Sequence, residues 1–197
     1  MLLQLEYTAW FGARPARFAL DPLAGHLDGV LWRVTLAPDG APILFDSIHP
    51  CGCYHLFFPT ERARARSMPP GPEEFVFVPR NLERPPPDAR VVLRIAARTH
   101  YIDHVRFETV ALPAGVAYAL QRYDTLTSLP TTVGARRSLF GPDGIVPDTE
   151  RLERWLFWPM GIAAPGSMRQ AGRHATAFVG RRHFDDPRLV DERFAID

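Results

Sequence analysis

The sequence predicts an α+β fold that is mainly antiparallel β-sheet, with a C-terminal helix packed on the sheet. Apolar and polar residues alternate through most of the first two thirds of the chain, as is typical of half-buried strands. Near residue 150 the apolar residues change to helical spacing. A chain of 197 residues, 46% of them hydrophobic, is large enough for one core. We therefore expect a single β-rich domain over residues 1–197, with a proline-rich interruption near residues 68–90.

The first strands are indicated by alternation and by turn residues. Leu3–Phe11 alternates in hydrophobicity until residues 12–15 interrupt the pattern. Val30–Leu36 and the run from residue 43 to 49 alternate in the same way, and Pro38–Gly40 between them is a strong turn signal. Residues 30–36 and 43–49 should therefore pair as an antiparallel hairpin.

Later strands are shorter and less regular. The charged run at residues 61–66 is expected to be a solvated face, and residues 75–78 form a brief strand candidate. Residues 91–97 are strand-like, and residues 107–112 and 116–120 form a further hairpin candidate around a Pro-Ala-Gly turn.

A helix is expected after the capping residues Pro147–Glu150. Leu152, Trp155, Leu156 and Met160 follow at helical spacing and would cover the sheet. Beyond Asp185 the chain is expected to be a loose, charged tail.

The most informative segment for function is Ser47–His55. It contains the only two cysteines of the chain and two of its seven histidines, at every second position: His49, Cys51, Cys53 and His55. On an extended strand these four side chains would point to the same face. Thiolate and imidazole are the ligands that zinc and other borderline metals prefer, so the pattern predicts a metal site.

A straight strand cannot bring these side chains to one ion. His49 and His55 would lie roughly 20 Å apart, whereas metal–ligand bonds are about 2.0–2.3 Å long. Pro50 and Gly52 favour a bulge or turn over Pro50–Cys53. Such a bend could gather three or four of these side chains around one ion, or the remaining ligands could come from elsewhere. His100 and His104 are the candidates for outside ligands because a spacing of four places them on one face, with Asp103 available to orient a neighbouring histidine.

Three functions remain open from the sequence, which does not establish whether the protein is an enzyme. The first is metal binding, with zinc as the default and copper or iron as alternatives; an open coordination position would permit metal-dependent hydrolysis. The second is thiol–disulfide redox chemistry at Cys51 and Cys53, assisted by a neighbouring histidine. The third is a non-catalytic structural or binding module in which these residues are packed.

Composition excludes several classes of function. All 23 basic residues are arginine, so mechanisms that need a lysine amine, such as pyridoxal phosphate chemistry and P-loop phosphate binding, are excluded. A net charge of +1 does not indicate a nucleic-acid partner, and no apolar run is long enough for a transmembrane segment. The start lacks a signal peptide, so the chain as given is expected to be cytoplasmic, although a strand pattern from the first residues also fits a fragment of a longer protein. The expected partner is a small molecule or protein that the sequence does not identify.

Overall fold

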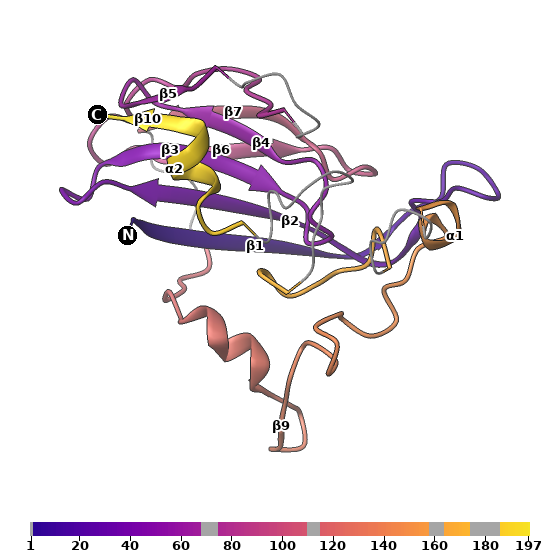
Figure 1. The fold of residues 1–197 in the computed structure, drawn as a ribbon. Coiled ribbons are helices and arrows are strands. Elements are labelled where there is room, and N and C mark those ends of the chain that lie inside the picture. Colours follow the sequence, from indigo (N-terminus) through magenta and orange to yellow (C-terminus); the bar gives the residue numbers. More distant parts are fainter. Residues whose placement is uncertain (1, 68–74, 110–114, 158–163, 174–185) are drawn as a thin grey trace.

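The main structural unit is a four-stranded antiparallel sheet. The computed structural model describes residues 2–67, 75–109, 115–157, 164–173 and 186–197. The strand order follows the sequence (Figure 1), and the strands are β1 (Leu3–Arg14), β2 (Gly25–Leu36), β3 (Pro42–Ile48) and β4 (Leu56–Pro59). The expectation of a mainly antiparallel β fold is therefore confirmed.

The predicted hairpin is confirmed as the β2–β3 pair. Leu31 pairs with Ile48 at one end and Leu36 with Pro42 at the other. The turn is closed by two backbone hydrogen bonds, from the Gly40 N–H to the Ala37 carbonyl and from the Ala37 N–H to the Ala41 carbonyl. Gly40 adopts φ +82°, a conformation that glycine reaches without the steric cost of a side chain.

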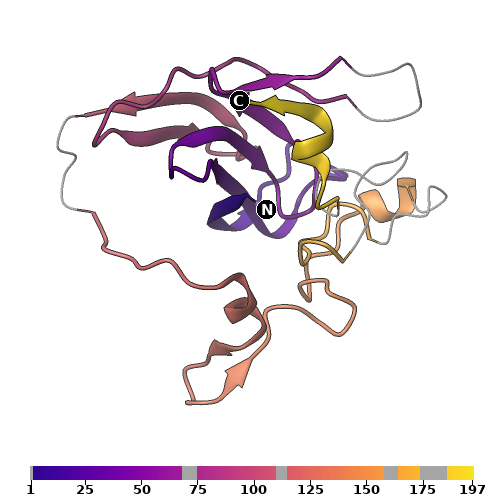
Figure 2. The ribbon, with the colours of Figure 1, turned by 60° about the vertical axis from the view of Figure 1, so that its left-hand side comes forward.

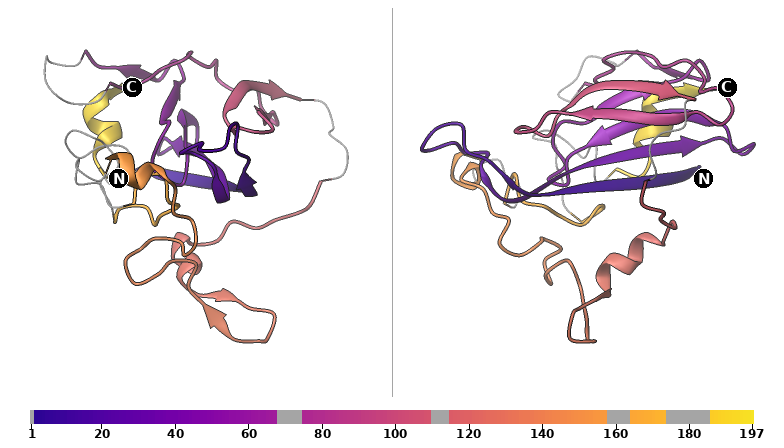
Figure 3. Two further views of the ribbon diagram at one scale, coloured as in Figure 1. Left: turned by 90° about the vertical axis from the view of Figure 1, so that its right-hand side faces the viewer. Right: turned by 180° about the vertical axis from the view of Figure 1, so that it is seen from behind.

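Both faces of the sheet are covered, so β3 is buried along nearly its whole length. Phe45 and Phe58 point to one face, where they pack with residues of the hairpin formed by β6 (Arg90–Ile95) and β7 (Ile102–Glu108). Leu44 and Phe57 point to the other face. There they pack with the pair of β5 (Ala63–Ala65) and β10 (Phe194–Ile196) and with helix α2 (Leu189–Arg193). Figure 3 shows β6 and β7 crossing one side of the sheet and α2 on the other.

The expected helix near residue 150 is present as a short helix within the described residues. Helix α1 comprises Glu153–Phe157, and the predicted position Met160 lies in 158–163, outside the described part of the chain. Trp155 and Leu156 are exposed, so α1 does not cover the sheet as expected. The helix that packs on the sheet is α2, which lies in the segment expected to be a loose tail. Its Leu189 and the following Phe194 are buried, and this burial outweighs the local charge.

Pairing with other parts of the chain determines which of the weakly predicted strands form. The charged run at residues 61–66 contains β5, which pairs with the C-terminal β10. β7 pairs with β6, and residues 116–120 form no strand, so the hairpin predicted for 107–112 with 116–120 is wrong for its described residues. In the stretch 75–78 only Phe77 forms a bridge, to Leu56.

After β7, the described residues 115–139 form an irregular segment outside the sheet. It contains a 3₁₀-helix, η1 (Tyr123–Thr127), and a two-residue pair of β8 (Leu129–Pro130) and β9 (Arg136–Arg137) (Figure 2). The chain returns through residues 140–151 and 164–170, which pack beside the turn that contains the cysteines. Within the proline-rich interruption, Leu82 packs into the same cluster as Trp32 and Val105. Among the described residues, no helix is both long enough and apolar enough to cross a membrane.

Candidate functional site: a thiol pair beside a buried carboxylate–histidine cluster

The His/Cys segment forms the connection between β3 and β4. The Gly52 N–H donates to the His49 carbonyl at 2.7 Å, and the His49 N–H donates to the Cys53 carbonyl at 3.0 Å. Gly52 lies at φ +85°, which the tight turn requires. The predicted bend over Pro50–Cys53 is therefore confirmed, and it separates the directions in which the four His and Cys side chains point.

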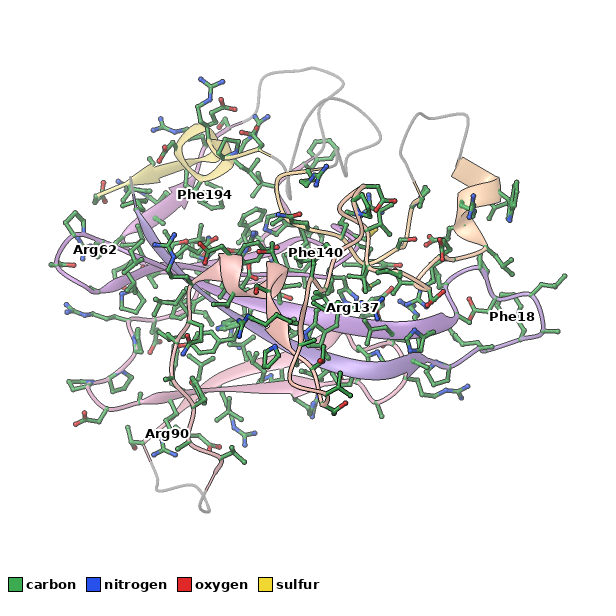
Figure 4. The ribbon with its side chains drawn as sticks, turned by 90° about the horizontal axis from the view of Figure 1, so that it is seen from below. Phe18, Arg62, Arg90, Arg137, Phe140 and Phe194 are labelled. Carbon is green, nitrogen blue, oxygen red and sulfur yellow. The ribbon has the colours of Figure 1, made fainter. Side chains whose placement is uncertain are left out.

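Cys51 and Cys53 lie together at a small cavity of about 20 Å³, which is room for about one water molecule. Cys51 is buried and Cys53 is half-buried. Cys51 packs in a cluster with Phe140, Val146 and Met168, and Figure 4 places Phe140 near the centre of the view. The cavity is lined by Arg14, Leu23, Asp28, His49, Cys51, Cys53, Tyr54, Arg151, Glu153, Gly166 and Met168.

The two thiols share one hydrogen bond, and this makes them unequal. The hydrogen bond from the Cys53 thiol lowers the pKa of Cys51, and the positive charge of Arg169 lowers it further against the opposing effects of burial and Glu153. The same hydrogen bond, together with burial, raises the pKa of Cys53. The pair therefore loses its first proton more readily than its second, and the thiolate belongs to Cys51.

Arg169 is held beside the thiols by main-chain contacts. Its backbone N–H donates to the Pro50 carbonyl at 3.0 Å, which ties the returning segment to the cysteine turn. Its guanidinium donates to the carbonyls of Ser167, at 3.2 Å, and Ala164, at 2.7 Å. These contacts fix a buried cation next to the Cys51 sulfur.

A second group of polar side chains, centred on Asp28, lies on the other side of the cavity. Asp28 is buried on β2, and its Oδ2 lies 2.6 Å from Nδ1 of His100. Nδ1 of His49 lies 3.9 Å from Oδ1, and the Arg151 guanidinium lies 3.7 Å from it. Arg151 also donates to the carbonyls of residues 26 and 27, so it is held rigidly.

These contacts set the charge of Asp28. Burial by itself would raise its pKa, but interactions with His49 and His100 outweigh burial and lower the pKa to about 2. We assign most of this effect to His100, because 2.6 Å is a hydrogen-bond distance and the 3.9 Å separation from His49 is not. Asp28 is therefore a buried anion at neutral pH, and its hydrogen bond orients His100.

Three non-glycine residues around this cluster have a left-handed backbone: Leu27 at φ +53°, Tyr54 at +57° and His100 at +55°. Such conformations cost on the order of 1 kcal/mol or more each and persist where the surroundings fix them. Here the fixed surroundings include the stacking of Phe11 on the His100 ring, with centroids 3.8 Å apart, and the contact of Tyr54 with Tyr101 at 4.6 Å. Their concentration around one cavity marks it as the candidate site.

The predicted ligands therefore divide into three groups. His49, Cys51 and Cys53 line the cavity, and His100 reaches its edge through Asp28. His55 lies elsewhere, with Nε2 2.8 Å from Asp46 and 2.9 Å from the Arg33 guanidinium.

His104 does not join His100, contrary to expectation. The two do not share a face, because His100 lies in the β6–β7 turn while His104 is exposed on β7 opposite Arg94. Asp103 is exposed and 3.9 Å from Arg94, so the carboxylate that orients a histidine is Asp28. Across the described residues, no three His, Cys, Asp or Glu side chains are arranged to hold a metal ion.

The residues that the sequence did not reveal are Asp28, Arg151 and Arg169. Asp28 looks like an ordinary polar residue of a strand. The two arginines lie more than 95 residues beyond the cysteines, and Arg151 looks like an ordinary charged residue at the start of the predicted helix. Only the proximity created by folding identifies them.

Comparison with protein-family models, with curated proteins and with solved structures found no match to this chain. The functional argument therefore depends on the geometry of the site.

Proposed function

We propose that Cys51 and Cys53 form a thiol redox site that reacts with a small peroxide. The observation that carries this proposal is the placement of both thiols at one cavity, with the buried guanidinium of Arg169 close enough for its charge to lower the pKa of Cys51. A hydrogen-bond donor and a cation both favour the thiolate, and the thiolate is the form that reacts with oxidants.

The charge around the thiol pair supports this proposal. Among the residues that line the cavity, the guanidinium groups of Arg14 and Arg151 oppose the carboxyl groups of Asp28 and Glu153, and burial raises the pKa of Glu153. Arg169 adds a further buried guanidinium whose charge acts on both cysteines. These positive charges favour a thiolate at Cys51 over the neutral thiol.

The chemistry proceeds in two balanced steps. The Cys51 thiolate attacks one oxygen of hydrogen peroxide, the O–O bond breaks, and the departing hydroxide takes a proton to become water, which leaves a sulfenic acid on Cys51. The Cys53 thiol then attacks the Cys51 sulfur, an S–S bond forms, and the hydroxyl leaves as a second water with the Cys53 proton. Peroxide is reduced by two electrons and the dithiol is oxidised to a disulfide.

The size of the cavity determines the class of oxidant. A volume of about 20 Å³ admits a molecule little larger than water, and Cys51 is only 7% exposed. A protein disulfide is far too large to reach Cys51. Cys53 is the less buried of the two residues, so a small thiol reductant that restores the dithiol would attack its sulfur rather than that of Cys51.

The test is oxidation of the reduced protein with hydrogen peroxide, followed by intact mass measurement. We expect the loss of two hydrogen atoms and of both free thiols, and no other cysteine complicates the result. Cys53→Ser should stop at the sulfenic acid, which dimedone traps. Arg137→Met, on an exposed strand, serves as the control for Arg169→Met, which should move the pH–rate profile of oxidation to higher pH. If peroxide oxidises the wild-type cysteines no faster than an ordinary free thiol and no disulfide forms, the proposal is refuted.

Metal binding is the second candidate, because His49 lines the same cavity as both cysteines. Zinc suits two thiolates and an imidazole, and copper or iron are the alternatives. Hydrolysis would require these three ligands plus an open position for water. Metal analysis of untagged protein distinguishes the candidates: stoichiometric metal that is lost from Cys51→Ser/Cys53→Ser favours this function, and its absence favours the redox site. If Cys51→Ser/Cys53→Ser neither loses metal nor changes the reaction of the protein with peroxide, the two cysteines serve only to pack the structure.

A further inference from the structure

A second and much larger hollow lies along the outer edge of the sheet, apart from the thiol pair. It has a volume of about 640 Å³, within the range of typical ligand sites. One wall is formed by six consecutive residues, Leu3 to Thr8. The opposite wall is formed by a segment from Tyr118 to Leu126, and Figures 1 and 3 show η1 of this segment below β1.

The lining identifies this hollow as a groove along a strand edge. Side chains of a strand alternate between faces, so a pocket over one face would be lined by every second residue. All six residues from 3 to 8 line this one, so the groove follows the backbone edge of β1. β1 is the terminal strand of its sheet and pairs only with β2 among the described strands. The groove is therefore bordered by backbone N–H and C=O groups that no described strand pairs with.

The opposite wall passes around the edge from one face of the sheet to the other. Tyr118 contacts Tyr7 edge-on, with ring centroids 6.0 Å apart. The neighbouring Glu6 must point to the other face, and there its charge affects the pKa of Tyr123. Tyr118 and Leu120 remain exposed, which leaves aromatic and aliphatic surface beside the unpaired edge.

The lining of the groove includes one carboxylate, that of Glu6, and one arginine, Arg122, whose guanidinium is paired with Asp124 at 2.9 Å. Glu6 lies opposite Arg33 in the β1–β2 register, and Arg33 in turn pairs with Asp46. One guanidinium is thus shared between two carboxylates. Burial raises the pKa of Glu6, Arg33 lowers it, and repulsion from Asp46 raises it again. A cation entering the groove would relieve that repulsion, and the tyrosine rings beside it are good neighbours for such a group.

We propose that this groove binds an extended peptide that carries a basic residue, by strand addition to the free edge of β1. The unpaired backbone supplies the main-chain hydrogen bonds, the half-buried Glu6 attracts the basic side chain, and Tyr118 and Leu120 cover the apolar side chains. Six residues of strand span about 20 Å, so the bound segment is five to seven residues long by the same rise of about 3.3 Å per residue.

The experiment uses a fluorescent seven-residue probe, alternating valine and threonine with one central arginine, and the full-length protein. We expect saturable binding by anisotropy, together with slower amide exchange in residues 3–8. Replacing the arginine by neutral citrulline should weaken binding by up to about fivefold. Methylating the backbone nitrogens on one edge of the peptide should abolish binding, because it removes the donors of the strand ladder.

Variants of the wall complete the test without touching the core. Tyr118→Ala/Leu120→Ala should weaken binding about tenfold, since both side chains are exposed in the free protein but covered in the complex. Val116→Ala is the matched control, because Val116 is exposed in the same segment but does not line the groove. Equal binding of the methylated peptide would show a general apolar site and overturn strand addition, as would unchanged exchange in residues 3–8.

Discussion

Asp28 provides the sharpest test of the electrostatics of the site. It is 2% exposed, and its contacts lower its pKa from 3.8 to about 2. A difference of this size corresponds to about 2 kcal/mol of folding free energy at neutral pH. Asp28→Asn keeps the shape of the side chain and removes the negative charge. We therefore expect this variant to lose about 2 kcal/mol of unfolding free energy at pH 7.

The pH dependence of that loss follows from the direction of the shift. Because the pKa of Asp28 is lower in the folded state, the stabilisation is fully present above pH 3.8, the value for the unfolded chain. It is lost as the pH falls towards 2, where the folded carboxylate takes up a proton. The difference between the wild type and Asp28→Asn should therefore be constant from pH 7 to about 5 and shrink steadily between pH 4 and 2.

Urea unfolding followed by circular dichroism, at several values of pH and fixed ionic strength, measures this difference. Asp124→Asn is the control, because Asp124 is an exposed carboxylate paired with Arg122, and its substitution should leave the unfolding free energy unchanged. A difference for Asp28→Asn that is absent at pH 7, or equally large at pH 7 and pH 3, would refute the assignment of Asp28 as a buried anion stabilised by His100.

Three further substitutions test the packing. Phe194→Ala, at a position 1% exposed, should cost about 3–5 kcal/mol of unfolding free energy in urea titration, whereas a loose tail would lose nothing. Arg33→Met should cost about 3–5 kcal/mol in the same assay, because it removes the guanidinium that pairs with the buried carboxylate of Asp46 while the imidazole of His55 stays beside it. Gly25→Ala would place a Cβ 2.1 Å from a guanidinium nitrogen of Arg151, so its Tm should fall, while Gly12→Ala, with open space around it, should melt no lower than the wild type.

The local features of the fold follow directly from the sequence. The alternation on either side of Pro38–Gly40 is enough to predict the β2–β3 hairpin, because a turn of that composition permits few other pairings. Pro50 and Gly52 likewise predict the bend that brings both cysteines to one cavity. In the hairpin and in the bend, the residues that interact lie within about twenty positions of one another in the sequence. The local pattern of residues is therefore enough to predict both features.

Contacts over long sequence distances were not predictable in this way. The charged run at residues 63–65 becomes a strand because it pairs with β10, some 130 residues later, and α2 is stabilised by the apolar face on which Leu189 packs. The helical spacing after residue 150 predicts a helix there, but not that Trp155 and Leu156 of α1 are exposed and cover no part of the sheet.

For the site, the sequence by itself determined the chemistry available: two thiols, nearby imidazoles and a turn that places the thiols together. Tertiary structure decided which groups surround them. It separated His55 and His104 from the cavity, placed Asp28 against His100, and brought Arg169 to the thiol pair. The reason is electrostatic as well as geometric, since the reactivity of a buried thiol depends on charges within a few ångströms, and those charges come from segments that only folding brings near.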